Sequence, residues 1–201
     1  MLYWLDFDTD KKYLYAYKDQ SLEGYNRVNC PSCNRIIASE RYVENQHHLL
    51  LEGGRVYPDY LQFSGAGKRL FLLSEKSLTL FRQHDITGFE EYEQVKVEIN
   101  KEFKKNINLD VLPRYYSIKI SGEIHVDLHA MHLKRKKVCP YCQQFSWSRQ
   151  RLGPIIVDLN SWDGSDICML KEFPGFKICS EKVVQIVNSN GLTGFEFCLL
   201  E

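Results

Sequence analysis

The chain repeats part of itself, and an internal repeat constrains a fold more than any other feature of a sequence. Residues 74–90 align with residues 180–196 at a constant offset of 106 residues and without a gap. Seven of these seventeen positions are identical, and they form Ser-Glu-Lys at one end and Thr-Gly-Phe-Glu at the other. A Cys-Pro-x-Cys motif also occurs twice, at 30–33 and at 139–142. The sequence therefore predicts two related repeats, residues 1–110 and 111–201.

Each aligned segment predicts one short helix. Ser74 and Ser180 are favourable N-cap residues, and each is followed by a Glu in the first turn, where the helix dipole favours a negative charge. Asp85 and Gly191 occupy the same position after the two helices, where a left-handed cap favours Gly and tolerates Asp. We expect the helices at residues 75–84 and 181–190.

Strand patterns outnumber helical ones in the rest of the chain. Alternating or β-branched residues predict strands at 13–17, 95–99, 115–120, 124–128, 155–159 and 195–200. The expected fold is α+β and internally duplicated. Each repeat should contribute a mainly antiparallel sheet, one short helix and a hairpin that carries its CxxC motif as a zinc knuckle.

The four paired cysteines, Cys30, Cys33, Cys139 and Cys142, predict one shared structural zinc site. Each CxxC turn supplies two thiolates, and the repeat favours bringing the two turns together. The separation between the pairs exceeds that of a compact zinc ribbon, so spacing alone leaves other interpretations open. These are two metal-free thiol pairs, two local disulfides or a catalytic dithiol. A site closed by four thiolates has no open coordination position, so its role would be structural.

A second candidate site lies at His125, Asp127 and His129, which alternate along the strand expected at 124–128. One interpretation is a metal-binding or catalytic face on that strand. The other is the solvent side of a half-buried strand, because the intervening residues are apolar.

A basic run, Lys134–Lys137, precedes the second CxxC, and Trp147, Arg149 and Arg151 follow it. These residues resemble a nucleic-acid patch, but lysines that protect a sheet edge explain them equally well. The chain has 26 Lys and Arg against 26 Asp and Glu, so no net charge attracts the whole molecule to nucleic acid. We do not expect nucleic acid as the main partner.

Signals for catalysis and for membrane insertion are missing from the sequence. Gly65 and Gly67 precede Lys68, but the phosphate-loop spacing and the following Ser or Thr are absent, so a turn is expected. No Gly-x-Ser-x-Gly or His-Glu-x-x-His motif occurs. No apolar run approaches the roughly 20 residues of a membrane span, and the first residues lack signal-peptide features. The sequence predicts a cytoplasmic protein that is not an enzyme and does not enter a membrane.

The order of several short motifs resembles that of the double-CXXCG motif proteins of bacteria. The motifs are the first Cys-Pro-x-Cys, Tyr57-Pro58-Asp59, Leu72-Leu73-Ser74-Glu75, Thr87-Gly88-Phe89-Glu90 and the second Cys-Pro-x-Cys. Asn34 and Gln143 stand where that family has Gly after each CxxC. In myxobacteria members of the family act as immunity proteins, so the resemblance implies a non-enzymatic protein that binds and blocks a cognate protein toxin. The alternative is a zinc-ribbon-like nucleic-acid-binding or regulatory module.

Overall fold

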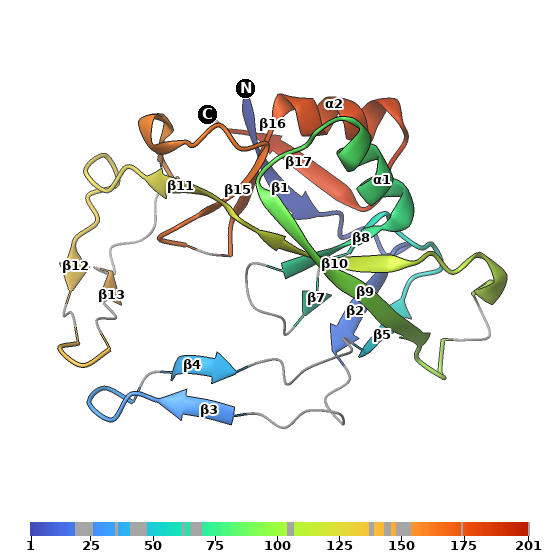
Figure 1. The fold of residues 1–201 in the computed structure, drawn as a ribbon, viewed down its shortest axis with the longest axis horizontal. Helices are drawn as coiled ribbons and strands as arrows, with labels where there is room; N and C mark the ends of the chain where they lie inside the picture. The colour runs from blue at the N-terminus through green and yellow to red at the C-terminus, as the bar shows by residue number, and fades with distance from the viewer. Residues whose placement is uncertain are drawn as a thin grey trace.

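A computed structural model describes residues 1–18, 26–34, 36–40, 48–61, 63–64, 70–103, 107–136, 139–142, 146–147, 154–173 and 175–200. Over these residues the fold is α+β, with two short helices beside curled, strand-rich sheets (Figure 1). The helices are α1 (Glu75–Gln83) and α2 (Glu181–Ser189). Each ends within one residue of the range that the sequence predicts. Neither they nor any other described helix is long and apolar enough to cross a membrane.

The described strands, in chain order, are β1 (Leu2–Phe7), β2 (Leu14–Lys18), β3 (Asn26–Asn29), β4 (Ile36–Glu40), β5 (His48–Gly53), β6 (Tyr60–Leu61), β7 (Phe63–Ser64), β8 (Leu70–Ser74), β9 (Phe89–Ile99), β10 (Tyr115–Ile120), β11 (Gly122–Val126), β12 (Arg135–Lys136), β13 (Ser146–Trp147), β14 (Val157–Asp158), β15 (Ile167–Leu170), β16 (Lys177–Ser180) and β17 (Phe195–Leu199). Two 3-10 helices are η3 (Leu109–Val111) and η4 (Leu159–Ser161).

The two large sheets each contain a strand from the opposite part of the chain. The six-stranded sheet has the order β14-β11-β15-β16-β1-β17, so the N-terminal β1 lies between two C-terminal strands. The seven-stranded sheet has the order β6-β8-β10-β9-β5-β2-β7, so β10 lies between β8 and β9. Most pairs are antiparallel, and among the described strands β11–β15, β2–β7 and β5–β9 are parallel.

Each of the strands β1 and β10, which lie among strands from the other part of the chain, begins beside the N-cap of a helix. Leu2 of β1 pairs with Ser180, and Tyr115 of β10 pairs with Ser74. Since these serines are the two helix N-caps, each inserted strand begins beside the first turn of a helix. Both helices are followed by a residue in the left-handed region, which confirms the caps expected at Asp85 (φ 48°) and Gly191 (φ 58°).

The strand predicted at 95–99 is longer, since β9 begins at Phe89, and two other predicted strands are shorter than expected. The strand expected at 124–128 ends at Val126, because Asp127 starts a turn in which its carboxylate accepts a hydrogen bond from the Ala130 N–H. The strand expected at 155–159 shortens to β14, because the Asp158 side chain accepts from the Asn160 N–H and caps η4. Short polar side chains that bond to nearby backbone compete with strand pairing in both places.

Asp59 joins three segments of the chain in an arrangement that we call the Asp59 clasp. One carboxylate oxygen accepts a hydrogen bond from the Ser74 hydroxyl at 2.7 Å. The other accepts from the N–H of Thr193 at 3.0 Å and from its hydroxyl at 3.2 Å. The clasp therefore ties the N-cap of α1 to the turn that follows α2.

Asp166 forms the matching arrangement between the N-cap of α2 and the turn that follows α1, and we call it the Asp166 clasp. Its carboxylate accepts from the Ser180 hydroxyl at 2.7 Å, and from the N–H and hydroxyl of Thr87 at 3.1 and 3.2 Å. The N-cap of α2 is thereby tied to the turn that follows α1. The two clasps account for the Ser and Thr positions that recur in the sequence.

The glycine after each clasp threonine has a steric reason. Gly88 and Gly194 have φ values of 88° and 85°, which disfavour any residue with a Cβ. A Cβ at Gly88 would also collide with the carbonyl oxygen of Ile167, and a Cβ at Gly194 with that of Tyr60. Each Thr-Gly pair can lie against the strand that follows its partner aspartate only because the glycine lacks a side chain.

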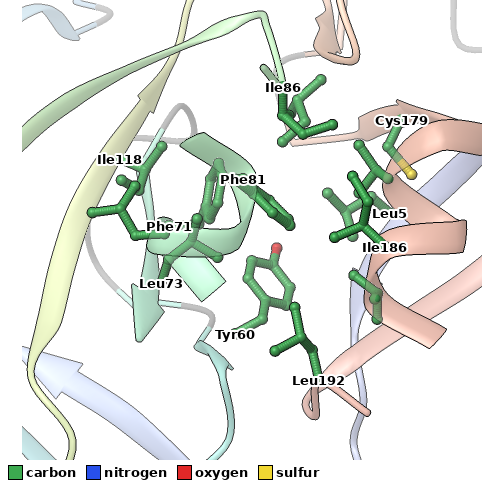
Figure 2. Close-up of a cluster of buried hydrophobic side chains, with 14 of the residues drawn as sticks. Leu5, Tyr60, Phe71, Leu73, Phe81, Ile86, Ile118, Cys179, Ile186 and Leu192 are labelled. Carbon is green, nitrogen blue, oxygen red and sulfur yellow. The ribbon is translucent and has the colours of Figure 1, made fainter. Parts of the chain in front are cut away.

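The largest buried cluster fills the space between the two helices and the two large sheets. Figure 2 shows Tyr60 near its centre, with Phe81 above it and Leu192 beside it. The Tyr60 ring stacks on Phe195 at a centroid distance of 4.9 Å and meets Phe71 edge-on at 5.4 Å. Residues from both large sheets thus share one core.

The Asp166 clasp predicts acid sensitivity. Burial opposes ionisation of Asp166, but the hydrogen bonds from Ser180 and Thr87 and the charge of Lys182 outweigh it and lower its pKa. A lowered folded-state pKa gives stability that is complete above the unfolded pKa of about 3.9 and is lost as the pH falls through the folded-state pKa. Asp166→Asn should lower the free energy of unfolding at pH 7 by about 1–3 kcal/mol. It should also flatten the loss of stability below about pH 4.

Urea unfolding between pH 2.5 and 7 measures both effects. Ser180→Ala is the matched control, since it keeps the carboxylate but removes one hydrogen bond, and it should retain part of the acid dependence. If Asp166→Asn showed the same pH dependence as the wild type, the clasp would not be its source.

Candidate metal centre

The two CxxC turns lie at the ends of two small two-stranded sheets. Residues 30–33 lie between β3 and β4, and residues 139–142 lie between β12 and β13. Figure 1 shows the two turns close to each other, on the side of the molecule away from the helices. Local pairing forms each turn, but only the tertiary structure brings the two turns together.

The four cysteine sulfurs form one compact group. All four Sγ atoms of Cys30, Cys33, Cys139 and Cys142 lie within 4.8 Å of one another. Two contacts cross between the turns: the sulfurs of Cys30 and Cys139, and those of Cys33 and Cys142, are each 3.7 Å apart. All four thiols are free.

These separations fit a tetrahedral metal ion. An ion with metal–sulfur bonds of about 2.3 Å requires sulfurs about 3.8 Å apart. A disulfide requires a sulfur–sulfur distance of about 2.05 Å, which is much shorter than either contact. Cys30 and Cys139 are buried and the other two are half-buried, so solvent has limited access to the group. The donor set and its spacing are those of a closed thiolate site.

The backbone of the first turn is shaped for this arrangement. The Asn34 N–H donates to the Cys30 carbonyl at 2.9 Å, which closes the turn around the cysteines. Asn34 itself has a φ of 56°, in the left-handed region that Gly adopts most easily and Asn tolerates. Its side-chain oxygen accepts from Asn29 at 3.2 Å across the base of the turn. Asn34 thus meets the conformational demand that a Gly would meet at this position.

Backbone amides favour the thiolate in the second turn. The N–H of Cys142 lowers the pKa of Cys139 most, and with the Tyr141 N–H and the Ser32 side chain it outweighs burial and brings that pKa to about 6. Hydrogen bonds to a charged form stabilise that form, and a thiolate is the species that binds metal.

The other three cysteines, Cys168, Cys179 and Cys198, lie outside this group. Cys168 and Cys179 are fully buried in the six-stranded sheet, where burial raises the pKa of both thiols, that of Cys168 to about 12. They are apolar core residues. Cys198 is exposed on β17.

The predicted alternation of His125, Asp127 and His129 along one strand is wrong, because the strand ends before Asp127. His125 instead contacts a carboxylate that the sequence did not indicate: its Nδ1 lies 2.8 Å from Glu172, whose side chain is 6% exposed. The second oxygen of Glu172 accepts from the Val126 N–H at 3.1 Å, which fixes the carboxylate in place. Over the described part of the chain, only the four cysteines form a group suited to a metal.

The other motifs are described only in part. Arg135 and Lys136 form β12 and pair with Trp147 and Ser146 of β13. The middle of the basic run therefore lies on the strand next to Trp147. Lys134 is exposed. The described residues do not include Lys137, Arg149 and Arg151, nor the Gly65–Lys68 turn.

Comparison with known proteins adds no relative. No family model matches the chain, and no curated protein matches its sequence. The resemblance to the double-CXXCG motif proteins therefore rests on the motifs themselves and stays a prediction.

Asn34 provides a test of the turn geometry. Asn34→Val should bind Co²⁺ about tenfold more weakly than Asn34→Gly, because a β-branched residue costs about 1–2 kcal/mol in the left-handed region. Both variants lose the bond to Asn29, so their difference isolates the backbone. Titration with Co²⁺, whose visible absorption reports tetrahedral thiolate coordination, measures the affinities. Equal affinities would show that the left-handed residue does not position the cysteines.

Proposed function

We propose that the protein is a duplicated, zinc-stabilised binding protein that neutralises a cognate bacterial toxin and has no catalytic activity of its own. The convergence of four cysteine sulfurs within 4.8 Å carries the metal part of this proposal. The resemblance of the motif order to that of the double-CXXCG proteins supports the toxin as partner, since members of that family in myxobacteria act as immunity proteins.

Matching contacts support the duplication. Asp59 contacts Ser74 and Thr193. Asp166 contacts Ser180 and Thr87, which align with Ser74 and Thr193 at the offset of 106 residues. The side chain of Lys76 donates to the Asn190 carbonyl, and that of Lys182 donates to the Asp85 carbonyl, one residue after the position that matches Asn190. Reciprocal contacts of this kind arise when two copies of one unit are related by an approximate two-fold axis.

Zinc suits the donor set better than other common ions. Thiolates are soft ligands, and a four-thiolate tetrahedral set is typical of structural zinc. Because the four sulfurs complete the coordination shell, such an ion would bind neither water nor substrate and would not catalyse a reaction. It would connect turns that are 109 positions apart in sequence and so restrict the unfolded chain.

Metal analysis tests this part of the proposal. Protein purified without added metal should contain one zinc per chain by mass spectrometry. Cys30→Ser and Cys139→Ser should each remove all of it, because the two turns share one ion. Cys198→Ser is the matched control, since this exposed thiol lies outside the group, and it should keep its zinc.

Two outcomes would contradict a shared site. Zinc that survives either substitution would mean that one turn suffices to hold it. A chain without zinc that keeps its thermal stability in a strong chelator would mean that the thiols have no metal role.

A binding role is also consistent with the exposed surface. Tyr141, within the second cysteine turn, is 65% exposed, and Phe176, directly before β16 of the six-stranded sheet, is 46% exposed. Large exposed aromatic residues are the side chains that most often anchor protein interfaces.

The toxin partner can be tested directly. A toxin encoded beside this chain should stop growth when expressed alone, and co-expression of the chain should restore growth. The two proteins should co-purify as a one-to-one complex, measured by light scattering after size exclusion. Failure of both rescue and complex formation would contradict the immunity role.

A specific observation keeps the nucleic-acid alternative in view: β12 and β13 place Arg135 and Lys136 opposite Trp147 and Ser146. Basic and aromatic side chains together suit a nucleic-acid backbone and its bases. Binding to DNA or RNA that weakens with salt and is lost in a Lys134→Glu, Lys136→Glu double variant would replace the toxin proposal with this one.

A further inference from the structure

The four cysteines of the metal centre divide into a buried pair and a more exposed pair. Cys30 and Cys139 are buried, at 1% and 8% exposure, whereas Cys33 and Cys142 are half-buried. We call Cys30 and Cys139 the inner pair, and Cys33 and Cys142 the outer pair. The division follows position in the motif, since the inner pair contains the first cysteine of each CxxC and the outer pair contains the second.

Each pair joins equivalent residues of the two turns. The members of each pair are 109 positions apart in sequence, and their two sulfurs are 3.7 Å apart. Contacts between equivalent residues are expected where an approximate two-fold axis passes through a group. The outer pair therefore brings two equivalent sulfurs together on the more exposed side of the metal centre.

The described surroundings of the outer pair are open to solvent. The two residues before Cys33 and the two before Cys142 are all exposed. By contrast, the Cys139 sulfur of the inner pair accepts hydrogen bonds from the Ser32 side chain and from the N–H groups of Tyr141 and Cys142. A small solute such as hydrogen peroxide thus reaches the outer sulfurs more easily than the inner ones.

Access decides which of these sulfurs reacts when a metal is bound. A metal ion holds its cysteine ligands as thiolates, so all four sulfurs are then deprotonated. Peroxides oxidise the thiolate, and the susceptibility of a cysteine follows its thiolate character and its exposure. Because the four sulfurs share the first property, the outer pair should react before the inner pair.

We propose that Cys33 and Cys142 are an oxidation site, at which a peroxide joins the two turns by a disulfide and expels the metal. This inference rests on the metal part of the proposed function and names a reaction of that same site. Oxidation of the outer pair leaves only the two inner thiolates, which are too few for a tetrahedral shell. The disulfide joins the same two turns that the metal joined, so the link between positions 109 apart is kept.

The reaction balances with hydrogen peroxide as the oxidant. One outer thiolate attacks a peroxide oxygen, the O–O bond breaks, hydroxide leaves and a sulfenic acid forms. The second outer thiolate attacks that sulfur, a sulfur–sulfur bond forms and a second hydroxide leaves. The two sulfurs together give two electrons to the peroxide, and both of their bonds to the metal break. The sulfurs approach from 3.7 Å to about 2.05 Å in this step.

The test uses the intact, metal-loaded protein. Hydrogen peroxide is added in steps, a chromogenic chelator measures released zinc, and peptide mapping by mass spectrometry locates the disulfides. We expect one zinc released and two thiols lost per peroxide consumed, with the first disulfide joining Cys33 to Cys142. Dithiothreitol with added zinc should reverse both changes. Cys198→Ser is the control, since this exposed thiol lies outside the group, and it should react as the wild type does.

Two variants that can still bind zinc test the outer position. Cys33→His and Cys30→His each leave three cysteines and one histidine, a ligand set that is common in structural zinc sites. Cys30→His keeps the outer pair and should release zinc at the wild-type rate. Cys33→His lacks one outer thiol and should release zinc at least about tenfold more slowly, because the exposed partner thiol is missing. Metal analysis checks that both variants hold zinc, and the mapping of the wild type stands without them.

The outcomes separate this inference from the proposed function. Zinc retained in the presence of peroxide, a first disulfide within one CxxC turn or between the inner cysteines, or equal zinc release by the two histidine variants would overturn the oxidation site alone. A chain purified without zinc would overturn both the metal role and the expulsion step. If peroxide acts as expected but no toxin is neutralised, the oxidation site stands and the immunity role fails.

Discussion

The carboxylates of Asp59 and Asp166 hold together parts of this fold that lie far apart in sequence. Each accepts hydrogen bonds from a helix N-cap serine and from a threonine in the turn after the opposite helix. One clasp joins the N-cap of α1 to the turn after α2, and the other joins the N-cap of α2 to the turn after α1. Displacing either helix would therefore break hydrogen bonds at both helices. The strands β1 and β10 begin beside the same N-cap serines, so their positions also depend on the two clasps.

The cysteine group is a second long-range constraint, located away from the clasps. It joins two small sheets whose own pairing is short, since β12 and β13 have two residues each. Short, two-stranded sheets are marginal alone, so a metal at their turns would contribute much of the stability of that region. A metal held by all four thiolates would have no open coordination position.

Local patterns predicted the elements whose formation depends on neighbouring residues. Ser74 and Ser180 are the N-cap residues of the two helices, but only the Ser74 side chain accepts a hydrogen bond from its first turn, while the Ser180 hydroxyl donates to Asp166. Asp85 and Gly191 end the helices with positive φ. These features depend only on residues close in sequence. Alternation predicted β10 over its full length. It failed after Val126, where an aspartate side chain bonded to the backbone and ended the strand. The clasp aspartates were missed although Asp59 and Asp166 precede their serines by 15 and 14 residues, since neither lies in the segment that aligns without a gap.

The sequence by itself determined the two helices, their caps, the α+β class and the four cysteines most suited to a shared metal, because each depends on residue type and short spacing. Only the tertiary structure decided that β1 and β10 lie among strands from the opposite part of the chain, and that the cysteine sulfurs converge to 3.7 Å. It also paired His125 with Glu172, and it buried Cys30 and Cys139 more deeply than Cys33 and Cys142. These features join residues far apart in sequence, and their positions depend on how whole sheets pack rather than on local preference.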